Sequence, residues 1–239
     1  MRPHTFTALK LSKMYSSEYE PLWDSLRTNL KNLVVWQQEG HVRDLPLLEL
    51  SGIGSSKSRG PWKTLKEFGM SHACQSIPRN SDSDFEKNLL HSFPKKKEPF
   101  RVWKVWWNGR TYWMNDDGSH HAAAAYVQAL EQKREISIPC AITHIRLDEV
   151  RATQIAQHFF GLVVIKKAAD RLSDALYRFG VPFQYGTYTP ANELLTLLFL
   201  PRSSRRATFV AETLLQLTAE DKVFNFTQFI FDSIATRSQ

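Results

Sequence analysis

The sequence predicts an α+β fold with a mixed sheet, followed by a C-terminal α/β lobe. Three observations support this prediction. An Asn-Gly pair, which is a strong hairpin signal, lies within an aromatic and β-branched run at 100–115. An alanine-rich helical segment follows at 120–132, and a strand pattern follows that helix at 135–147. Beyond residue 148, helical and strand patterns alternate toward the end of the chain.

The composition is typical of a folded globular protein. The chain has 239 residues, of which 42% are hydrophobic and 23% are charged, enough for one large domain or two small ones. We expect an N-terminal helical segment at 1–41, a mixed-sheet domain at 42–147 with a loop-rich insert at 52–83, and the C-terminal lobe at 148–239. The two cysteines match no metal-binding or redox spacing, so we expect buried, unpaired thiols.

Charge and hydropathy restrict the classes of partner. The formal net charge is +7, which is compatible with nucleic acid or another polyanion, but the basic residues are dispersed over the chain. No apolar run reaches the roughly 20 residues that span a bilayer. The first residues also lack the continuous apolar core of a secretory signal. We therefore expect a cytoplasmic protein that binds no membrane.

The first part of the chain predicts helices separated by extended and loop segments. Between 15 and 39, leucine recurs at three- and four-residue spacing, which predicts a helix with one apolar face. Gly40 can end this helix. Residues 42–51 predict a short extended segment interrupted by proline. Within the insert, Gly, Ser and Pro predict loops, with one short helix inside 62–70. A second short helix is predicted at 82–93, where capping residues begin the segment.

The C-terminal lobe is predicted to contain capped helices and apolar strands. One helix is capped by Asp148 and ends near Gly161, and a second ends at Gly180. The later segments are two strands, one helix with a strand as its alternative, and a terminal helix, at 182–188, 193–201, 203–217 and 224–234.

The candidate site is a run of six polar and small residues between the hairpin and the alanine-rich helix: Asp116, Asp117, Gly118, Ser119, His120 and His121. A helix that begins directly after a strand presents free backbone N–H groups and the positive end of its dipole, which attract anions. Glycine lets the backbone approach a phosphate closely. Serine offers a hydroxyl, and the histidines offer ring N–H donors that can carry charge near neutral pH.

Each of these residues also has a plain structural interpretation. Asp116 and Asp117 can hold Mg²⁺ that bridges to phosphates, or they can simply form the turn. Ser119 can be an N-cap for the helix. Adjacent helical residues point about 100° apart, so His120 and His121 cannot both face one ligand. The aromatic side chains of the hairpin can stack on bases, or they can pack in the core and across strands.

Several segments between residues 42 and 145 carry a family resemblance. In order they are "LPLLEL", a small helix that ends near Phe93, "PFRVWKV", "YWMNDDGSHHAAAAYVQAL" and "ISIPCAI". The order resembles the ParB/sulfiredoxin-like superfamily, in which a "DGxHR" or "GERR" turn and the following helix bind the phosphates of CTP or ATP. The resemblance implies phosphate-binding roles for Gly118, Ser119, His120 and His121. Here "DGSHH" replaces "DGxHR", and no segment resembles the helix-turn-helix of the DNA-binding members.

Three functions are compatible with these observations. The first is a nucleotide- or phosphate-binding protein, regulatory or DNA-associated, with CTP or ATP and Mg²⁺ as ligands. The second is a Mg²⁺-dependent phosphotransferase or nuclease in which Asp116, Asp117 and His120 are the metal-binding and acid/base groups. The third is a protein-interaction module that keeps the fold without a ligand. The sequence does not predict the oligomeric state or the pathway.

Overall fold

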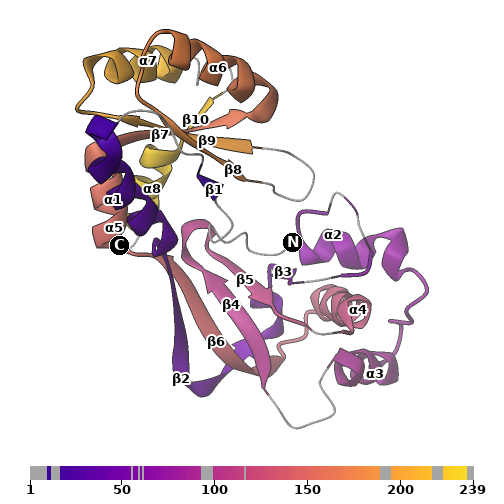
Figure 1. Ribbon diagram of the computed structural model, residues 1–239. Helices are drawn as coiled ribbons and strands as arrows, with labels where there is room; N and C mark the ends of the chain where they lie inside the picture. Colours follow the sequence, from indigo (N-terminus) through magenta and orange to yellow (C-terminus); the bar gives the residue numbers. More distant parts are fainter. Residues whose placement is uncertain are drawn as a thin grey trace. The chain divides into compact units, whose positions relative to one another are not determined.

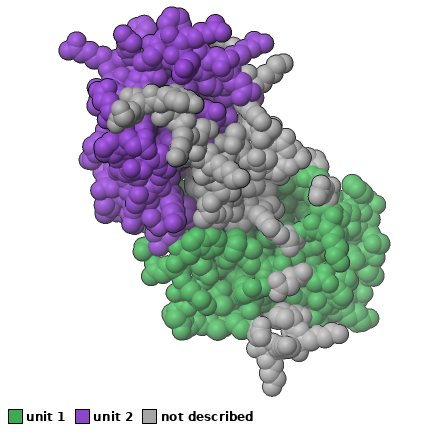
Figure 2. Space-filling model, in the orientation of Figure 1, with its two compact units in different colours: residues 1–3, 36–146 green, residues 4–35, 147–239 purple. Residues whose placement is uncertain are grey.

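The structure is a computed structural model that describes residues 10–11, 17–54, 56–58, 60, 62–92, 99–115, 117–188, 195–216 and 223–235. The chain divides into two compact units (Figure 2). Unit 1 comprises residues 1–3 and 36–146, and unit 2 comprises residues 4–35 and 147–239. Each unit contains helices and a five-stranded sheet, so the predicted mixture of helices and strands is confirmed.

Unit 1 is built on a mixed sheet with the strand order β2-β6-β4-β5-β3. Its strands are β2 (Val34–Pro46), β3 (Gly52–Ile53), β4 (Phe100–Val105), β5 (Arg110–Trp113) and β6 (Ser137–Leu147). β4 pairs antiparallel with β5 and parallel with β6, and β3 pairs parallel with β5. The predicted hairpin and the strand after the helix are therefore confirmed.

The hairpin turn is longer than the two-residue turn that its Asn-Gly pair suggests. A 3₁₀ turn (Trp106–Asn108) precedes Gly109, and only Gly109 adopts the left-handed conformation, with φ of 62°. The side chain of Asn108 accepts a hydrogen bond from the backbone N–H of Arg110 at 3.0 Å. This bond holds the end of the turn where β5 begins.

Three helices cover one face of this sheet: α2 (Leu65–Met70), α3 (Asp82–Ser92) and α4 (Ser119–Glu131) (Figure 1). α2 and α3 both pack against α4. The alanine run makes this possible, because Ala123 is fully buried and a Cβ at Gly69 of α2 would lie 2.5 Å from its carbonyl oxygen. Small residues on both helices thus bring the start of α4 close to its neighbours.

The predicted helix over 15–39 is wrong in its length. The helix is α1 (Glu20–Lys31), and β2 begins at Val34. The Asn32 side chain donates to the carbonyl oxygen of Thr28 at 3.0 Å, and its backbone N–H bonds back into the last turn. Leu33 is buried but lies beyond the helix. The β-branched pair after Leu33 favours a strand, and this preference prevails over the leucine spacing.

Unit 2 contains a second sheet, with the strand order β1-β8-β9-β7-β10. Its strands are β1 (Lys10–Leu11), β7 (Phe159–Ile165), β8 (Gln184–Tyr188), β9 (Leu195–Pro201) and β10 (Val223–Asn225). Every pair in it is antiparallel. We expected an α/β lobe, in which helices connect parallel strands, but here the helices cover an antiparallel sheet.

The helices of unit 2 largely follow the prediction. Beside α1 they are α5 (Glu149–His158), α6 (Lys166–Arg178), α7 (Arg205–Gln216) and α8 (Phe226–Ala235). α6 and α7 cover one face of the sheet, and α1, α5 and α8 cover the other (Figure 1). Segment 203–217 is thus mostly helical, which rejects the strand alternative. Gly161 does not end a helix: α5 ends at His158, and Gly161 lies inside β7.

The sequence correctly predicted one aspartate N-cap and one glycine that ends a helix. The Asp148 carboxylate accepts the backbone N–H of Arg151 at 3.0 Å at the start of α5. Gly180, with φ of 59°, follows α6, and Val181 donates its backbone N–H to the Leu176 carbonyl at 2.9 Å. This is the left-handed glycine ending that the sequence indicates.

Both cysteines are buried and unpaired, as expected. Burial raises the pKa of the Cys74 thiol to about 11 and that of Cys140 to about 12. Both therefore stay protonated near neutral pH, and we assign neither a chemical role. None of the helices in the described ranges is long and apolar enough to cross a membrane.

Candidate functional site

The candidate site lies where the chain passes from β5 into α4. Gly118 is the N-cap of α4 and has φ of 72°, a left-handed conformation that glycine adopts without strain. A Cβ at this position would lie 3.0 Å from Cα of Ser92 and 3.2 Å from the His91 carbonyl oxygen. We expected this glycine to admit a phosphate. In the structure, the backbone that comes close to it is that of α3.

Ser119 is the first residue of α4, and the prediction that it caps the helix is wrong. Gly118 occupies the N-cap position, and no side chain makes a capping hydrogen bond there. The Ser119 hydroxyl instead lies 3.3 Å from the hydroxyl oxygen of Ser56 and 3.4 Å from Nδ1 of His120. Ser119 thus joins the helix to the loop that follows β3.

His120 faces this same loop. Its Nε2 lies 2.8 Å from Oγ of Ser58, and its ring packs against Phe68 of α2 with a centroid separation of 5.3 Å. Nδ1 approaches Ser119 at the other side of the ring. The imidazole is therefore held on three sides, by the loop, by α2 and by its own helix.

His121 points toward α3 instead. Its Nδ1 donates to Oδ1 of Asn88 at 2.8 Å, and its ring lies 3.8 Å from the ring of His91 between centroids. Burial lowers the pKa of His121, and the neighbouring His91 and His120 lower it further. The prediction that the two adjacent histidines diverge is confirmed. Only His120 faces the loop side of the turn.

The loop after β3 supplies groups that our sequence analysis did not select. Ser56, Lys57 and Ser58 belong to the segment "GIGSSKSRG", which we treated only as part of a loop-rich insert. Ser56 accepts the backbone N–H of Ser58 at 3.2 Å, which bends the loop onto itself. The signal was present in the composition, because glycines interspersed with hydroxyl side chains and a lysine are typical of loops that bind phosphate.

Of the two aspartates predicted to bind Mg²⁺, the structure describes one. Asp116 lies outside the described residues. Asp117 is exposed, and its Oδ1 lies 4.0 Å from Nζ of Lys57. Its pKa is lowered, chiefly because the backbone N–H of Gly118 bonds to it and then because Lys57 is near. Within the described ranges, no three His, Cys, Asp or Glu side chains gather as a metal site would require. A Mg²⁺ site at these aspartates stays a prediction.

Hydrogen-bond donors and a positively charged side chain lie near the start of α4. The first backbone bond at this end joins the N–H of Ala122 to the Gly118 carbonyl at 2.9 Å. The N–H groups of Ser119, His120 and His121 have no acceptor in the described part of the chain. Beside them stand the imidazole of His120, two loop hydroxyls and the ammonium of Lys57. Such an arrangement can bind an anion through both hydrogen bonds and charge.

Comparison with known families adds one finding. A family model matches residues 41–237 and is described as a family of unknown function, DUF6685. The chain belongs to this family. The DUF6685 match spans both the α4 turn and the loop that follows β3, so the candidate site lies within the family region. The chain has no significant match among curated proteins or among solved structures.

Proposed function

We propose that the protein binds the phosphates of a nucleotide at the start of α4, in a regulatory or DNA-associated role. One observation carries the proposal: the loop with Ser56, Lys57 and Ser58 folds onto the start of α4, where the first backbone N–H groups have no acceptor among the described residues. The resemblance to the ParB/sulfiredoxin-like superfamily supports it independently, because the matching turn of that superfamily binds CTP or ATP phosphates. The net charge of +7 favours a polyanionic ligand.

His120 is the side chain that we expect to contact the phosphate. Its ring faces the loop and lies beside the Ser58 hydroxyl at the start of α4, whereas His121 points away from the loop toward Asn88 on α3. A charge-assisted hydrogen bond of this kind contributes roughly 1.5–3 kcal/mol. Lys57 pairs only loosely with Asp117, and both side chains are exposed. Because exposed ion pairs contribute little, Lys57 can leave Asp117 and turn to a phosphate.

Titration calorimetry with ATP and CTP, each with and without Mg²⁺, tests this function. We expect the wild-type chain to bind one of them, and His120→Ala to weaken that binding roughly 10- to 100-fold. His121→Ala is the matched control, because it removes the adjacent imidazole from the other side of the helix and should leave the affinity nearly unchanged. Absence of binding by the wild type, or equal loss in both variants, would refute the proposal.

A second candidate function is phosphoryl transfer, and the contact between Ser58 and His120 favours it. A hydroxyl oxygen at 2.8 Å from an imidazole nitrogen is positioned for activation by a general base. In this reaction His120 takes the Ser58 hydroxyl proton, Oγ bonds to the terminal phosphorus of ATP, and ADP leaves. Asp116 and Asp117 would hold the Mg²⁺ that accompanies the nucleotide. ATP meets the protein in the cytoplasm, where we expect it to act.

A further inference from the structure

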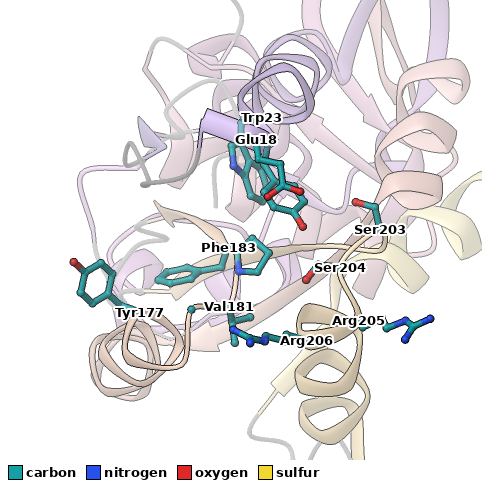
Figure 3. A pocket seen from close by; sticks show the side chains of 12 residues that line it. Glu18, Trp23, Tyr177, Val181, Phe183, Ser203, Ser204, Arg205 and Arg206 are labelled. Atoms are coloured by element: carbon teal, nitrogen blue, oxygen red, sulfur yellow. The ribbon is translucent and has the colours of Figure 1, made fainter.

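Unit 2 contains a cavity of about 470 Å³ beside the start of α7 (Figure 3). Trp23 and Phe183 line it, but these residues are only 2% and 1% exposed, so a ring placed there would find little surface to cover. Arg206 lies on the lower side of the cavity and already donates to the Phe179 carbonyl oxygen at 3.2 Å. We assign no ligand to this cavity. The feature that carries an inference is a hydrogen-bonded chain of three side chains in unit 1.

The three side chains are Glu39 of β2, His144 of β6 and Trp106 of the turn that connects β4 to β5. β6 lies between β2 and β4 in the sheet, so the imidazole has a neighbouring strand on each side (Figure 1). Nε1 of Trp106 lies 3.2 Å from Nδ1 of His144, and Nε2 of His144 lies 2.8 Å from Oε1 of Glu39. The imidazole is therefore bonded through both of its nitrogens.

Trp106 requires the neutral form of this imidazole. An indole N–H can only donate, so Nδ1 of His144 must accept and cannot carry a hydrogen. The single hydrogen of the neutral ring is then on Nε2, which donates it to the Glu39 carboxylate. A protonated ring carries a hydrogen on both nitrogens. Its Nδ1–H would face the indole N–H, and two donors form no hydrogen bond, so this contact exists only while His144 is neutral.

Glu39 favours the charged form of the same ring. Its side chain is 14% exposed, and its Oε2 is buried without a donor in the described part of the chain. The hydrogen bond from His144 lowers the pKa of the Glu39 carboxyl, although burial acts in the opposite direction. A carboxylate held in this way is stabilised more by a cationic donor than by a neutral one. The two partners of His144 therefore favour opposite protonation states.

The remaining charged groups beside this chain lie on β2 and across β4. On β2, Arg43 lies 3.4 Å from Oε1 of the carboxylate, and His41 also acts on that group. On β4, Lys104 is the register partner of His144, and it pairs with Glu49 at 3.7 Å. The connecting turn contains no titratable side chain. Each cation already faces a carboxylate, so neither strongly opposes a charge on the imidazole.

We propose that His144 is a pH-sensitive contact, which holds the turn between β4 and β5 while it is neutral and releases Trp106 when it is protonated. Histidine suits this role because its side chain takes up a proton between about pH 5 and 8. On protonation, the bond between Nδ1 and the indole N–H is lost, and the imidazolium stays with Glu39. Trp106 is 43% exposed and lies in a short 3₁₀ turn, so its indole can move without opening the core. The contact lies within unit 1 and does not depend on the proposed nucleotide site.

Nitrogen–proton correlation NMR spectroscopy of the full chain tests the proposal through the indole N–H signals. The chain has seven tryptophans, and Trp106→Phe identifies the signal of Trp106 by its absence. We expect this signal to shift in one step as the pH falls from about 8 to about 5. The midpoint of the step should equal that of the ring signals of His144. A Trp106 signal that is constant over this range, or that shifts with a different midpoint, would overturn the proposal.

His144→Gln tests whether the step comes from this imidazole. Glutamine can accept the indole N–H with its oxygen and donate to Glu39 with its nitrogen, but it does not titrate. The Trp106 signal should therefore stay near its high-pH position throughout the titration. His41→Gln is the matched control, because it removes an exposed imidazole from β2 and should leave the step unchanged. A step that persists in His144→Gln, or that disappears in His41→Gln, would contradict the assignment to His144.

Glu39→Gln tests the competition between the two partners. The variant keeps an acceptor for Nε2 of His144 but removes the charge that favours the imidazolium. The midpoint of the Trp106 step should therefore move to lower pH by about one unit or more. An unchanged midpoint, or one that moves to higher pH, would show that Glu39 does not compete with Trp106 for the state of the ring.

Discussion

Nε2 of His120 lies 2.8 Å from the hydroxyl oxygen of Ser58, 62 residues earlier in the chain. This contact joins the loop after β3 to the first turn of α4. It places a hydroxyl and an imidazole beside backbone amides that have no acceptor within the described ranges. A phosphate bound at the amides would meet both side chains. The contact therefore has a different role in each proposed function. In nucleotide binding it orients His120 toward the phosphate, and in phosphoryl transfer it lets His120 activate Ser58.

Replacing Ser58 by alanine distinguishes nucleotide binding from phosphoryl transfer to Ser58. If Ser58 accepts a phosphoryl group, Ser58→Ala should abolish incorporation of label from γ-labelled ATP while its ATP affinity changes by less than about tenfold. Label incorporation and titration calorimetry measure the two effects. Ser56→Ala is the matched control, because its hydroxyl lies in the same loop but contacts Ser119 instead of His120. Persistent labelling of Ser58→Ala, or none in the wild type, would exclude phosphoryl transfer to this serine.

Local patterns were sufficient to predict the elements around the site. The hairpin, the alanine-rich helix and the strand after it were each predicted from hydrophobic periodicity and turn residues, and each is present in unit 1. The divergence of His120 and His121 followed from helix geometry alone. These features depend on residues close together in sequence, where preferences of the backbone and side chains act directly.

Long-range packing explains what the sequence did not predict. The contact of Ser58 with His120 joins segments that no local pattern connects. Gly118, and not Ser119, is the N-cap of α4; its φ is 72°, and a Cβ at this position would lie 3.0 Å from Cα of Ser92 in α3. The leucine spacing before β2 predicted a longer helix, but the β-branched pair after Leu33 belongs to β2 and pairs in the sheet. Sheet pairing supplies energy that helical periodicity does not reveal.

Stability should fall on acidification because of His121. Burial, followed by the neighbouring His91 and His120, lowers the pKa of His121 in the folded state below its ordinary value of 6.5, although Asp117 acts in the opposite direction. Below about pH 6.5 the unfolded chain therefore binds more protons at this position than the folded chain. The free energy of unfolding should decrease as the pH falls from about 7.5 to about 5.5, measured by urea denaturation.

His121→Gln provides the comparison for this pH effect. Glutamine can still donate to Oδ1 of Asn88 but does not titrate, so the variant should lose stability less steeply on acidification. If the wild type and His121→Gln depend on pH identically, His121 does not couple protonation to folding.

Gly118→Ala should destabilise unit 1 more than Gly109→Ala. Both glycines have a left-handed backbone, with φ of 72° and 62°, which costs roughly 1–2 kcal/mol for an alanine. A Cβ at Gly109 meets nothing within 4 Å, so Gly109→Ala should lose about that amount. At Gly118 the Cβ also meets backbone atoms of Ser92 and His91, which cannot rotate away. We expect a loss of more than about 2 kcal/mol there, measured by urea denaturation.

Gly40→Ala completes this comparison. Gly40 lies in β2 of the same unit, has no positive φ, and a Cβ there meets nothing within 4 Å, so the substitution should be neutral or slightly stabilising. All three glycines belong to unit 1, so the same unfolding transition reports on each of them. Equal losses at Gly118 and Gly109 would mean that α3 can move away from the turn. The start of α4 would then be held by its backbone conformation alone, and the close approach of α3 would not fix the position of His120.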